Sequence, residues 1–309
     1  MINFRYHVVS LTAVFLALAI GLVVGTAALN GPVANDLSDR VNQLTKSNSQ
    51  YRAQVNALNQ EVAQKEQFAT DIAPELLAGK LAGRRVVVVS MSKSSDLVQP
   101  TIDMLTLGGA TVTGQIEIED SFVDAAKGPD LLDLAEESQT TDTITGLPSN
   151  SDGVETSTAL FAAVLTDHTP VVPQSVRENV LKAYASAGYL SFKDDSITSP
   201  AEAVVFLGPL PYTDTNASTE NAGVVTIVSQ FATVAPTLVG ADGSAGSGNI
   251  IGAITGDQSL AGVVSTVDNV GTPQGRVAAV LALSDQLDKD QIGHYGLASS
   301  ATSLVPETK

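Results

Sequence analysis

The sequence contains no cysteine and only three histidines and three methionines among 309 residues. Without cysteine there is no disulfide framework, no thiolate nucleophile and no cysteine-based metal site. Basic residues are also few, because 16 Lys and Arg stand against 33 Asp and Glu and leave a net charge of −17. This balance argues against nucleic acid as a partner, since nucleic-acid binding depends on Lys and Arg that contact phosphates. It argues equally against docking onto anionic lipid headgroups.

The longest uncharged run is VVSLTAVFLALAIGLVVGTAAL, residues 8–29. As a helix this run spans about 33 Å, which is enough to cross the roughly 30 Å hydrocarbon core of a bilayer. A cleaved signal peptide is the alternative, because small residues near Thr26 offer a cleavage site. Signal peptides have a shorter apolar region, about 7–15 residues. We therefore predict an uncleaved transmembrane helix at residues 8–29.

Charged residues on either side of this run predict its orientation. Arg5 and the terminal amine precede the run, whereas Asp36 and Asp39 follow it together with Arg40. The positive-inside rule then places residues 1–7 in the cytoplasm. The protein is therefore expected to be a single-pass protein of the cytoplasmic membrane. The rest of the chain, after the span, is expected in the periplasm-like envelope space outside this membrane.

Small residues recur every fourth position along the predicted span, at Ala13, Ala17, Gly21 and Gly25. This spacing places them on one ridge and includes a GxxxG pair, through which two membrane helices can approach closely. The alternative is that small residues in a span are ordinary composition. The sequence leaves both interpretations open.

Residues 33–73 follow a heptad pattern with apolar residues at a and d. The central a and d positions are Val41, Leu44, Asn48, Tyr51, Val55, Leu58 and Val62. Val at a with Leu at d favours a parallel two-stranded coil, and one Asn at a fixes its register. An amphipathic helix lying on the globular domain is the alternative, but the unbroken heptads fit it poorly. We predict that two copies of the chain form a homodimer through this coil, which ends at Pro74.

Residues 84–297 show the alternating pattern of an α/β domain. The run RRVVVVS at 84–90 is typical of a strand buried on both faces of a parallel sheet. Further strands are expected at 111–119, 189–192, 203–207, 237–240 and 263–267, and helices at 95–107, 129–137, 157–165, 175–187, 218–231 and 273–287. Thr272 is predicted to cap the last of these helices, with Pro273 at its first position. This alternation predicts an extracytoplasmic α/β domain with a mostly parallel sheet, followed by a C-terminal tail at 298–309.

An acidic segment interrupts this pattern. Between Gly128 and Val176 there is no Lys or Arg, but there are eight Asp and Glu. Residues 136–155 are therefore predicted to form a mobile acidic loop. A disordered insert that becomes ordered on a partner is the alternative.

Candidate metal ligands are scattered. His7, His168 and His294 are isolated from one another, and none forms a pair at metal-ligand spacing. His294, in the sequence Gly-His-Tyr-Gly, is the best candidate of the three, with a packed turn as the alternative. Met91 and Met104 are predicted to be plain core residues. We therefore expect no metal site.

Catalytic motifs are also missing. The glycine-rich stretch 243–249 lacks the Lys-Ser/Thr pair that completes a P-loop, which favours a flexible turn. Ser90 lacks the glycines of a GxSxG nucleophile elbow. The acidic pairs at 119–120 and 194–195 are expected to be solvated loop charges rather than acid and base partners. The sequence predicts no catalytic residue, no cofactor and no enzyme activity.

Three blocks of sequence resemble the actinobacterial MctB/SteB family. They are MINFRYHVVSLTAVFLALAIGLVVGTAALNGP at the N-terminus, the RRVVVV strand, and VVSTVDNVGTPQGRVAAVLALSDQLDKDQIGHYG at residues 263–296. The resemblance covers essentially the whole chain. It implies either copper transport at the outer membrane, as for the mycobacterial protein that gives the family its name, or a SteB-like role in cell separation together with the membrane protein SteA.

The residues do not fit these two implied functions equally. Copper(I) prefers soft sulfur ligands or clustered histidines. The chain has no cysteine, few methionines and three histidines that lie far apart in the sequence. We therefore predict a non-enzymatic, membrane-anchored scaffold for cell separation and cell-envelope integrity. It would act through protein partners, including a SteA-like second membrane protein. MctB-like copper transport or efflux is the alternative.

Overall fold

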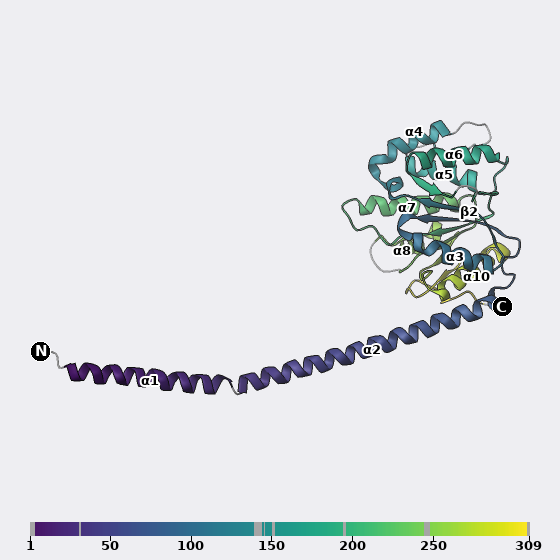
Figure 1. Cartoon of the computed structure of the whole chain (residues 1–309). Coiled ribbons are helices and arrows are strands. Elements are labelled where there is room, and N and C mark those ends of the chain that lie inside the picture. Colours follow the sequence, from purple (N-terminus) through teal and green to yellow (C-terminus); the bar gives the residue numbers. More distant parts are fainter. Residues whose placement is uncertain are drawn as a thin grey trace. The chain divides into compact units, whose positions relative to one another are not determined.

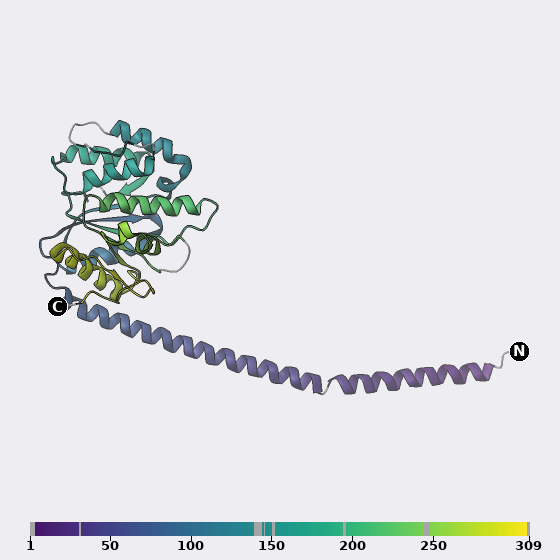
Figure 2. The ribbon, with the colours of Figure 1, turned by 180° about the vertical axis from the view of Figure 1, so that it is seen from behind.

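The structure is a computed structural model that describes residues 4–30, 32–138, 144, 146–149, 152–193, 196–243 and 248–307. The chain divides into two units, Met1–Lys65 and Glu66–Lys309. The first unit is helical and the second is an α/β domain (Figures 1 and 2). Helix α2, Pro32–Leu77, begins in the first unit and ends in the second.

The first unit begins with the apolar helix α1, Phe4–Asn30, which includes the whole of the predicted span at residues 8–29. Residues Phe4–Ala27 have a mean hydropathy of 2.6 and are long and apolar enough to cross a membrane. None of this stretch is buried inside the protein, as expected for a helix whose solvent is lipid. The rest of the unit is the N-terminal part of α2.

The second unit is organised by one sheet in which the described residues form seven strands in the order β3-β2-β1-β4-β5-β6-β7. All neighbouring strands are parallel except β3, which lies antiparallel to β2 at the edge. The mostly parallel sheet predicted from the sequence is therefore confirmed. The strands are β1 Arg85–Met91, β2 Thr111–Ile118, β3 Leu190–Phe192, β4 Ala203–Leu207, β5 Thr237–Gly240, β6 Val264–Val267 and β7 His294–Tyr295.

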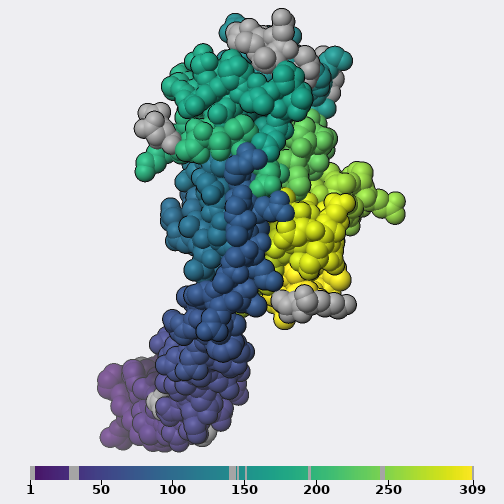
Figure 3. All heavy atoms as spheres, turned by 90° about the vertical axis from the view of Figure 1, so that its right-hand side faces the viewer, coloured from purple at the N-terminus to yellow at the C-terminus, as the bar shows by residue number. Residues whose placement is uncertain are grey.

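Helices cover both faces of the sheet and enclose two cores. One face carries α3, Ser95–Leu107, and α10, Pro273–Lys289, together with the last turns of α2. The space-filling view shows the early residues of this domain, in blue, beside its yellow C-terminal residues (Figure 3). The other face carries α4 Gly128–Ser138, α5 Gly153–Leu165, α6 Gln174–Ser186, α7 Ala217–Ala232, α8 Ile250–Gly256 and α9 Gln258–Ala261.

Local sequence explains why α10 begins where the sequence predicts. The Thr272 hydroxyl accepts a hydrogen bond from the backbone N–H of Gly275 at 3.1 Å, and Pro273 occupies the first helical position. A hydroxyl cap followed by proline is the pattern that helix starts prefer. The helix ends at Lys289, where Asp290 takes a left-handed conformation with φ of 55°.

The coil is predicted to end at Pro74, but helix α2 continues through this proline to Leu77. Ala73 and Leu77 lie on either side of the proline and are 1% and 0% exposed in the core shared with α3 and α10. Proline removes one backbone hydrogen bond from a helix. Burial of these apolar side chains offsets that loss, which a prediction from local sequence does not include.

The predicted acidic loop at 136–155 is also wrong at both of its ends. Helix α4 extends to Ser138, and α5 already begins at Gly153, where the Asp152 carboxylate accepts a hydrogen bond from the backbone N–H of Glu155. Ile144, inside the segment, is buried in the core. Residues 139–143, 145, 150 and 151 of this prediction lie outside the described residues.

Candidate functional site

An apolar stripe runs along α2 at the predicted a and d positions. Val55 and Leu44 are 53% and 71% exposed, and Val41, Tyr51, Leu58 and Val62 are similarly open. Asn48 lies within the stripe and is also exposed. Exposed apolar residues on one helical face are typical of a surface that pairs with another helix. The parallel homodimer stays a prediction, and this stripe is its predicted interface.

The stripe does not continue to the end of α2. Ala69, the a position of the last predicted heptad, is 7% exposed and belongs to the α/β unit, as do the buried residues Ala73 and Leu77. These residues are one turn apart on one face of the helix. The end of α2 is therefore part of its own domain, and a coil between two copies must end before Ala69.

The small residues Ala13, Ala17, Gly21 and Gly25 are all part of α1. A side chain added at Gly21 or Gly25 meets nothing within 4 Å in the single chain. Larger residues at these positions are therefore compatible with the helix itself, and a loss of association on substitution would report on contacts between helices.

We expect Gly21→Leu and Gly25→Leu to weaken self-association of the membrane helix on the order of tenfold, because leucine holds the two backbones apart. The measurement is a genetic reporter of transmembrane-helix association. Val23→Leu is the matched control, since Val23 lies on the opposite side of α1. Equal association of all three variants would mean that the small residues are only composition.

The candidate metal ligands do not come together. Met91 packs in the core beneath α5 and α7, whereas Met104 packs in the core on the other face of the sheet. The Nδ1 atom of His168 lies 2.9 Å from the carbonyl oxygen of Pro170. Within the described part of the chain, no three His, Asp or Glu residues are grouped so that they could hold a metal ion.

His294, the best candidate in the sequence, lies in strand β7 rather than in a turn. Its Nδ1 atom is 3.0 Å from the hydroxyl of Thr266 on the neighbouring strand. Burial lowers the pKa of His294, which keeps the ring neutral near pH 7. The residue is a packed part of the sheet.

We expect the purified protein to bind copper(I) no better than a protein of similar charge, because its two internal methionines are separated by the sheet. Titration against a copper(I) chelator measures this. Met91→Leu and Met104→Leu should leave the titration unchanged. Tight binding at a fixed stoichiometry that is lost in either variant would contradict the expectation.

A polar cluster lies at the carboxyl edge of the sheet, where β1 stands between β2 and β4. The chain leaves β1 toward β2 on one side and returns to β4 on the other, so the loops diverge at this point and form the usual ligand crevice of open α/β sheets. Lys93 follows β1, Asp120 follows β2 and Tyr212 follows β4. Side chains more than a hundred residues apart in sequence therefore meet at one edge.

The three side chains contact one another. The Tyr212 hydroxyl donates a hydrogen bond to Asp120 Oδ1 at 2.6 Å, and Lys93 Nζ lies 3.0 Å from Asp120 Oδ2. Lys93 Nζ also lies 3.8 Å from the centre of the Tyr212 ring, within the range of a cation–π contact. Asp120, predicted to be a solvated loop charge, has a side chain that is 41% exposed, but it is also paired with Lys93 and Tyr212. Residues 194–195 lie outside the described part of the chain.

Charge and burial fix the protonation of this cluster. Burial by itself would raise the pKa of Asp120, but the hydrogen bonds from Tyr212 and Lys93 outweigh burial and bring the pKa below its usual value. Burial, together with the hydrogen bond to Asp120, raises the pKa of Tyr212. Neither group is ready to exchange a proton near neutral pH. The cluster ties three loops together and does not have the properties of an acid–base centre.

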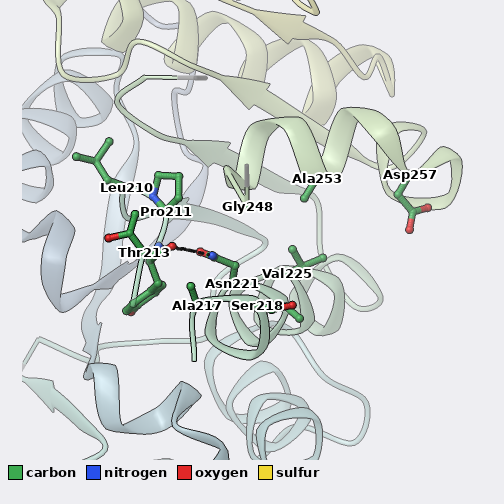
Figure 4. A pocket seen from close by; sticks show the side chains of 12 residues that line it. Leu210, Pro211, Thr213, Ala217, Ser218, Asn221, Val225, Gly248, Ala253 and Asp257 are labelled. Atoms are coloured by element: carbon green, nitrogen blue, oxygen red, sulfur yellow. Dashed lines mark hydrogen bonds between the residues drawn. The ribbon is translucent and has the colours of Figure 1, made fainter. Parts of the chain in front are cut away.

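A cavity of about 1020 Å³ lies beside this cluster. It is open to solvent and is lined by the loop after β4, helix α7 and the α8–α9 segment (Figure 4). Asn221 of α7 holds the loop in place, since its Oδ1 accepts from the Tyr212 backbone N–H at 2.9 Å and its Nδ2 donates to the Tyr212 carbonyl at 3.2 Å. This site was not predicted from the sequence, although Asp120 and Tyr212 each follow a predicted strand closely and could have indicated the edge of the sheet.

The glycine-rich stretch 243–249 leads into α8. Its residues 244–247 lie outside the described residues, and Asn249 caps the helix by accepting hydrogen bonds from the backbone N–H groups of Ile251 and Gly252 at 2.9 and 3.2 Å. Helix α8 was not predicted, although Asn249 is a favoured cap residue and is followed by the apolar residues Ile250, Ile251 and Ile254.

An apolar membrane helix, a long helix with an exposed stripe and an α/β domain define a membrane-anchored protein whose described residues show no catalytic centre. The chain belongs to the family described as "Copper transport outer membrane protein, MctB", whose profile matches residues 1–306. The family predicted from the sequence is thereby confirmed. Copper transporter MctB of Mycobacterium tuberculosis (strain ATCC 25618 / H37Rv) is 28% identical over 324 residues, which cover 99% of each chain. Copper transporter MctB of Mycobacterium leprae (strain TN) is 30% identical over 330 residues, which cover 99% of this chain and 100% of the relative.

Proposed function

We propose that this protein takes part in copper transport across the cell envelope as a non-enzymatic, membrane-anchored component. The observation that carries the proposal is the match along the whole chain, including α1, to relatives named as copper transporters. This match favours copper transport over the cell-separation role predicted from the sequence. In this proposal the N-terminus is cytoplasmic, and the α/β domain occupies the periplasm-like envelope space.

In this proposal the path for copper is formed by an assembly of proteins and not by a single copy of this chain. Copper needs soft or clustered ligands, and the described residues bring no such group together. One membrane helix cannot enclose a pore by itself. The chain would therefore act as a homodimer joined through the α2 stripe, and a second membrane protein of the SteA-like kind would complete the path or regulate it.

A second candidate is the SteB-like scaffold, which serves cell separation and envelope integrity and handles no metal. The observation that favours it is the position of Met91 and Met104 on opposite faces of the sheet. A scaffold needs an anchor, an extended helix and a partner surface, and it needs no ligand set.

Deletion of the gene separates the two functions. Under copper transport, the deletion strain should stop growing at a copper concentration that the parent tolerates, while its septa look normal by microscopy. Complementation with the full chain should restore growth. Unchanged copper tolerance together with daughter cells that fail to separate would reject copper transport and support the scaffold.

A further inference from the structure

The cavity beside Tyr212 is an apolar groove. Its apolar lining comes from Leu210, Pro211, Ala217, Ala222, Val225 and Ala253. Leu210 is 63% exposed at one wall, and Val225 and Ala253 come from α7 and α8 on either side (Figure 4). A groove lined mostly by apolar side chains with a few polar groups is typical of a site that binds a ligand or partner.

The groove is preformed. Both hydrogen bonds of Asn221 hold the backbone at Tyr212, and the Tyr212 hydroxyl is fixed by Asp120. Gly248 lies against the Asn221 side chain so closely that a Cβ at this position would stand 2.9 Å from the Asn221 Cγ. Walls held in this way lose little freedom when something binds, which favours affinity.

The surroundings of the groove are acidic. Asp257 lines it, Asp214 follows the lining residue Thr213, and Glu220 precedes the lining residue Asn221 on α7. One oxygen of Glu220, Oε2, is buried without a hydrogen-bond partner. None of the described residues lining the groove is Lys or Arg, and the nearby Lys93 is paired with Asp120. Burial and the neighbouring Asp214 raise the pKa of Glu220, although the charge of Lys93 acts in the opposite direction. The Asp257 carboxylate accepts hydrogen bonds from the backbone N–H and the hydroxyl of Ser259 at 2.8 and 2.6 Å, and these bonds leave its negative charge in place.

We propose that this groove binds a cationic, amphipathic peptide segment of a partner protein. Apolar side chains of the segment lie between α7 and α8, and its Lys or Arg residues pair with Asp214, Glu220 and Asp257. This is the groove mode of peptide recognition, in which apolar anchors give affinity and charge gives orientation. The inference assigns a partner surface to the α/β domain and does not depend on whether the protein handles copper.

The test uses the full chain in phosphatidylcholine nanodiscs. The probe is a fluorescein-labelled peptide of about ten residues with leucines at helical spacing and lysines between them, and empty nanodiscs are the blank. Fluorescence anisotropy is measured at about 0.15 M salt, where surface charges act only over about 8 Å. The variants are Leu210→Asp in the groove and Leu297→Asp as the matched control, since Leu297 is also exposed, at 72%.

Leu210→Asp should weaken binding of the probe at least about tenfold, and Leu297→Asp should leave binding unchanged. Both variants add one negative charge, so attraction of the peptide by net charge alone would strengthen equally in both. Such equal behaviour would overturn the proposal, as would failure of the probe to bind the natural protein. Equal binding of a probe with glutamates in place of the lysines would also overturn it and would indicate a neutral apolar ligand. If Leu210→Asp does not fold, Asp257→Asn, which keeps a helix cap, should weaken binding of the lysine probe.

Discussion

Gly275→Ala should destabilise the α/β domain by about 3 kcal/mol or more. A Cβ at Gly275 would overlap the backbone carbonyl of Asn269 and lie 2.8 Å from the Asn269 Oδ1. The obstacle is backbone held in the turn before α10, which cannot move aside without breaking the Thr272 cap. This change in the free energy of unfolding is opposite in sign to the usual one, because Gly→Ala inside a helix normally stabilises a protein by about 1 kcal/mol. Denaturant unfolding of the detergent-solubilised protein, followed by circular dichroism, measures the change.

Gly252→Ala is the control for this prediction. Gly252 lies in α8, and a Cβ there meets nothing within 4 Å. We expect this variant to be neutral or to stabilise by up to about 1 kcal/mol. If Gly275→Ala had the same stability as Gly252→Ala, the close contact between Gly275 and the turn at Asn269 would be contradicted.

Val55→Cys should give a disulfide-linked dimer in most of the protein under mild oxidation. The two copies of an a position face each other in a parallel coil, and a disulfide needs Cβ atoms about 3.5–4.5 Å apart. The natural chain has no cysteine, so the introduced thiol is the sole source of crosslinks. Non-reducing gel electrophoresis of the membrane fraction measures the dimer.

Gln60→Cys is the matched control for the crosslinking experiment. Gln60 is also exposed on α2, but it occupies the f position of the predicted heptad and points away from the partner. It should crosslink weakly. Crosslinking that is stronger at Gln60 than at Val55 would reject the predicted heptad, and with it the dimer interface along Val41–Val62.

The strands and helices of the domain were largely predictable because their signals are local. Strand β1 is indicated by a run of consecutive valines, and the start of α10 is indicated by the adjacent residues Thr272 and Pro273. The helix end at Leu77 was not predictable in this way, because it depends on a core built by α3 and α10. Strand β7 has only two residues and no local signal.

The cluster at the sheet edge was harder to predict than the fold. Lys93, Asp120 and Tyr212 meet only because β1 lies between β2 and β4. Alternation of strands and helices along the chain predicts a parallel sheet but leaves open the order of its strands. A site formed by three separate loops therefore becomes visible only when the strand order is known.

Leu77 and Leu81 are buried in the domain although they precede its first strand. A truncated protein without the membrane helix must therefore include them. Both leucines are 0% exposed, and removal of a buried leucine side chain costs about 2–5 kcal/mol. A truncated protein starting at Arg84 would lose both, an amount comparable to the total stability of about 5–15 kcal/mol of a typical domain. A soluble fragment suited to crystallisation should therefore begin at Glu66, with its first residues still helical.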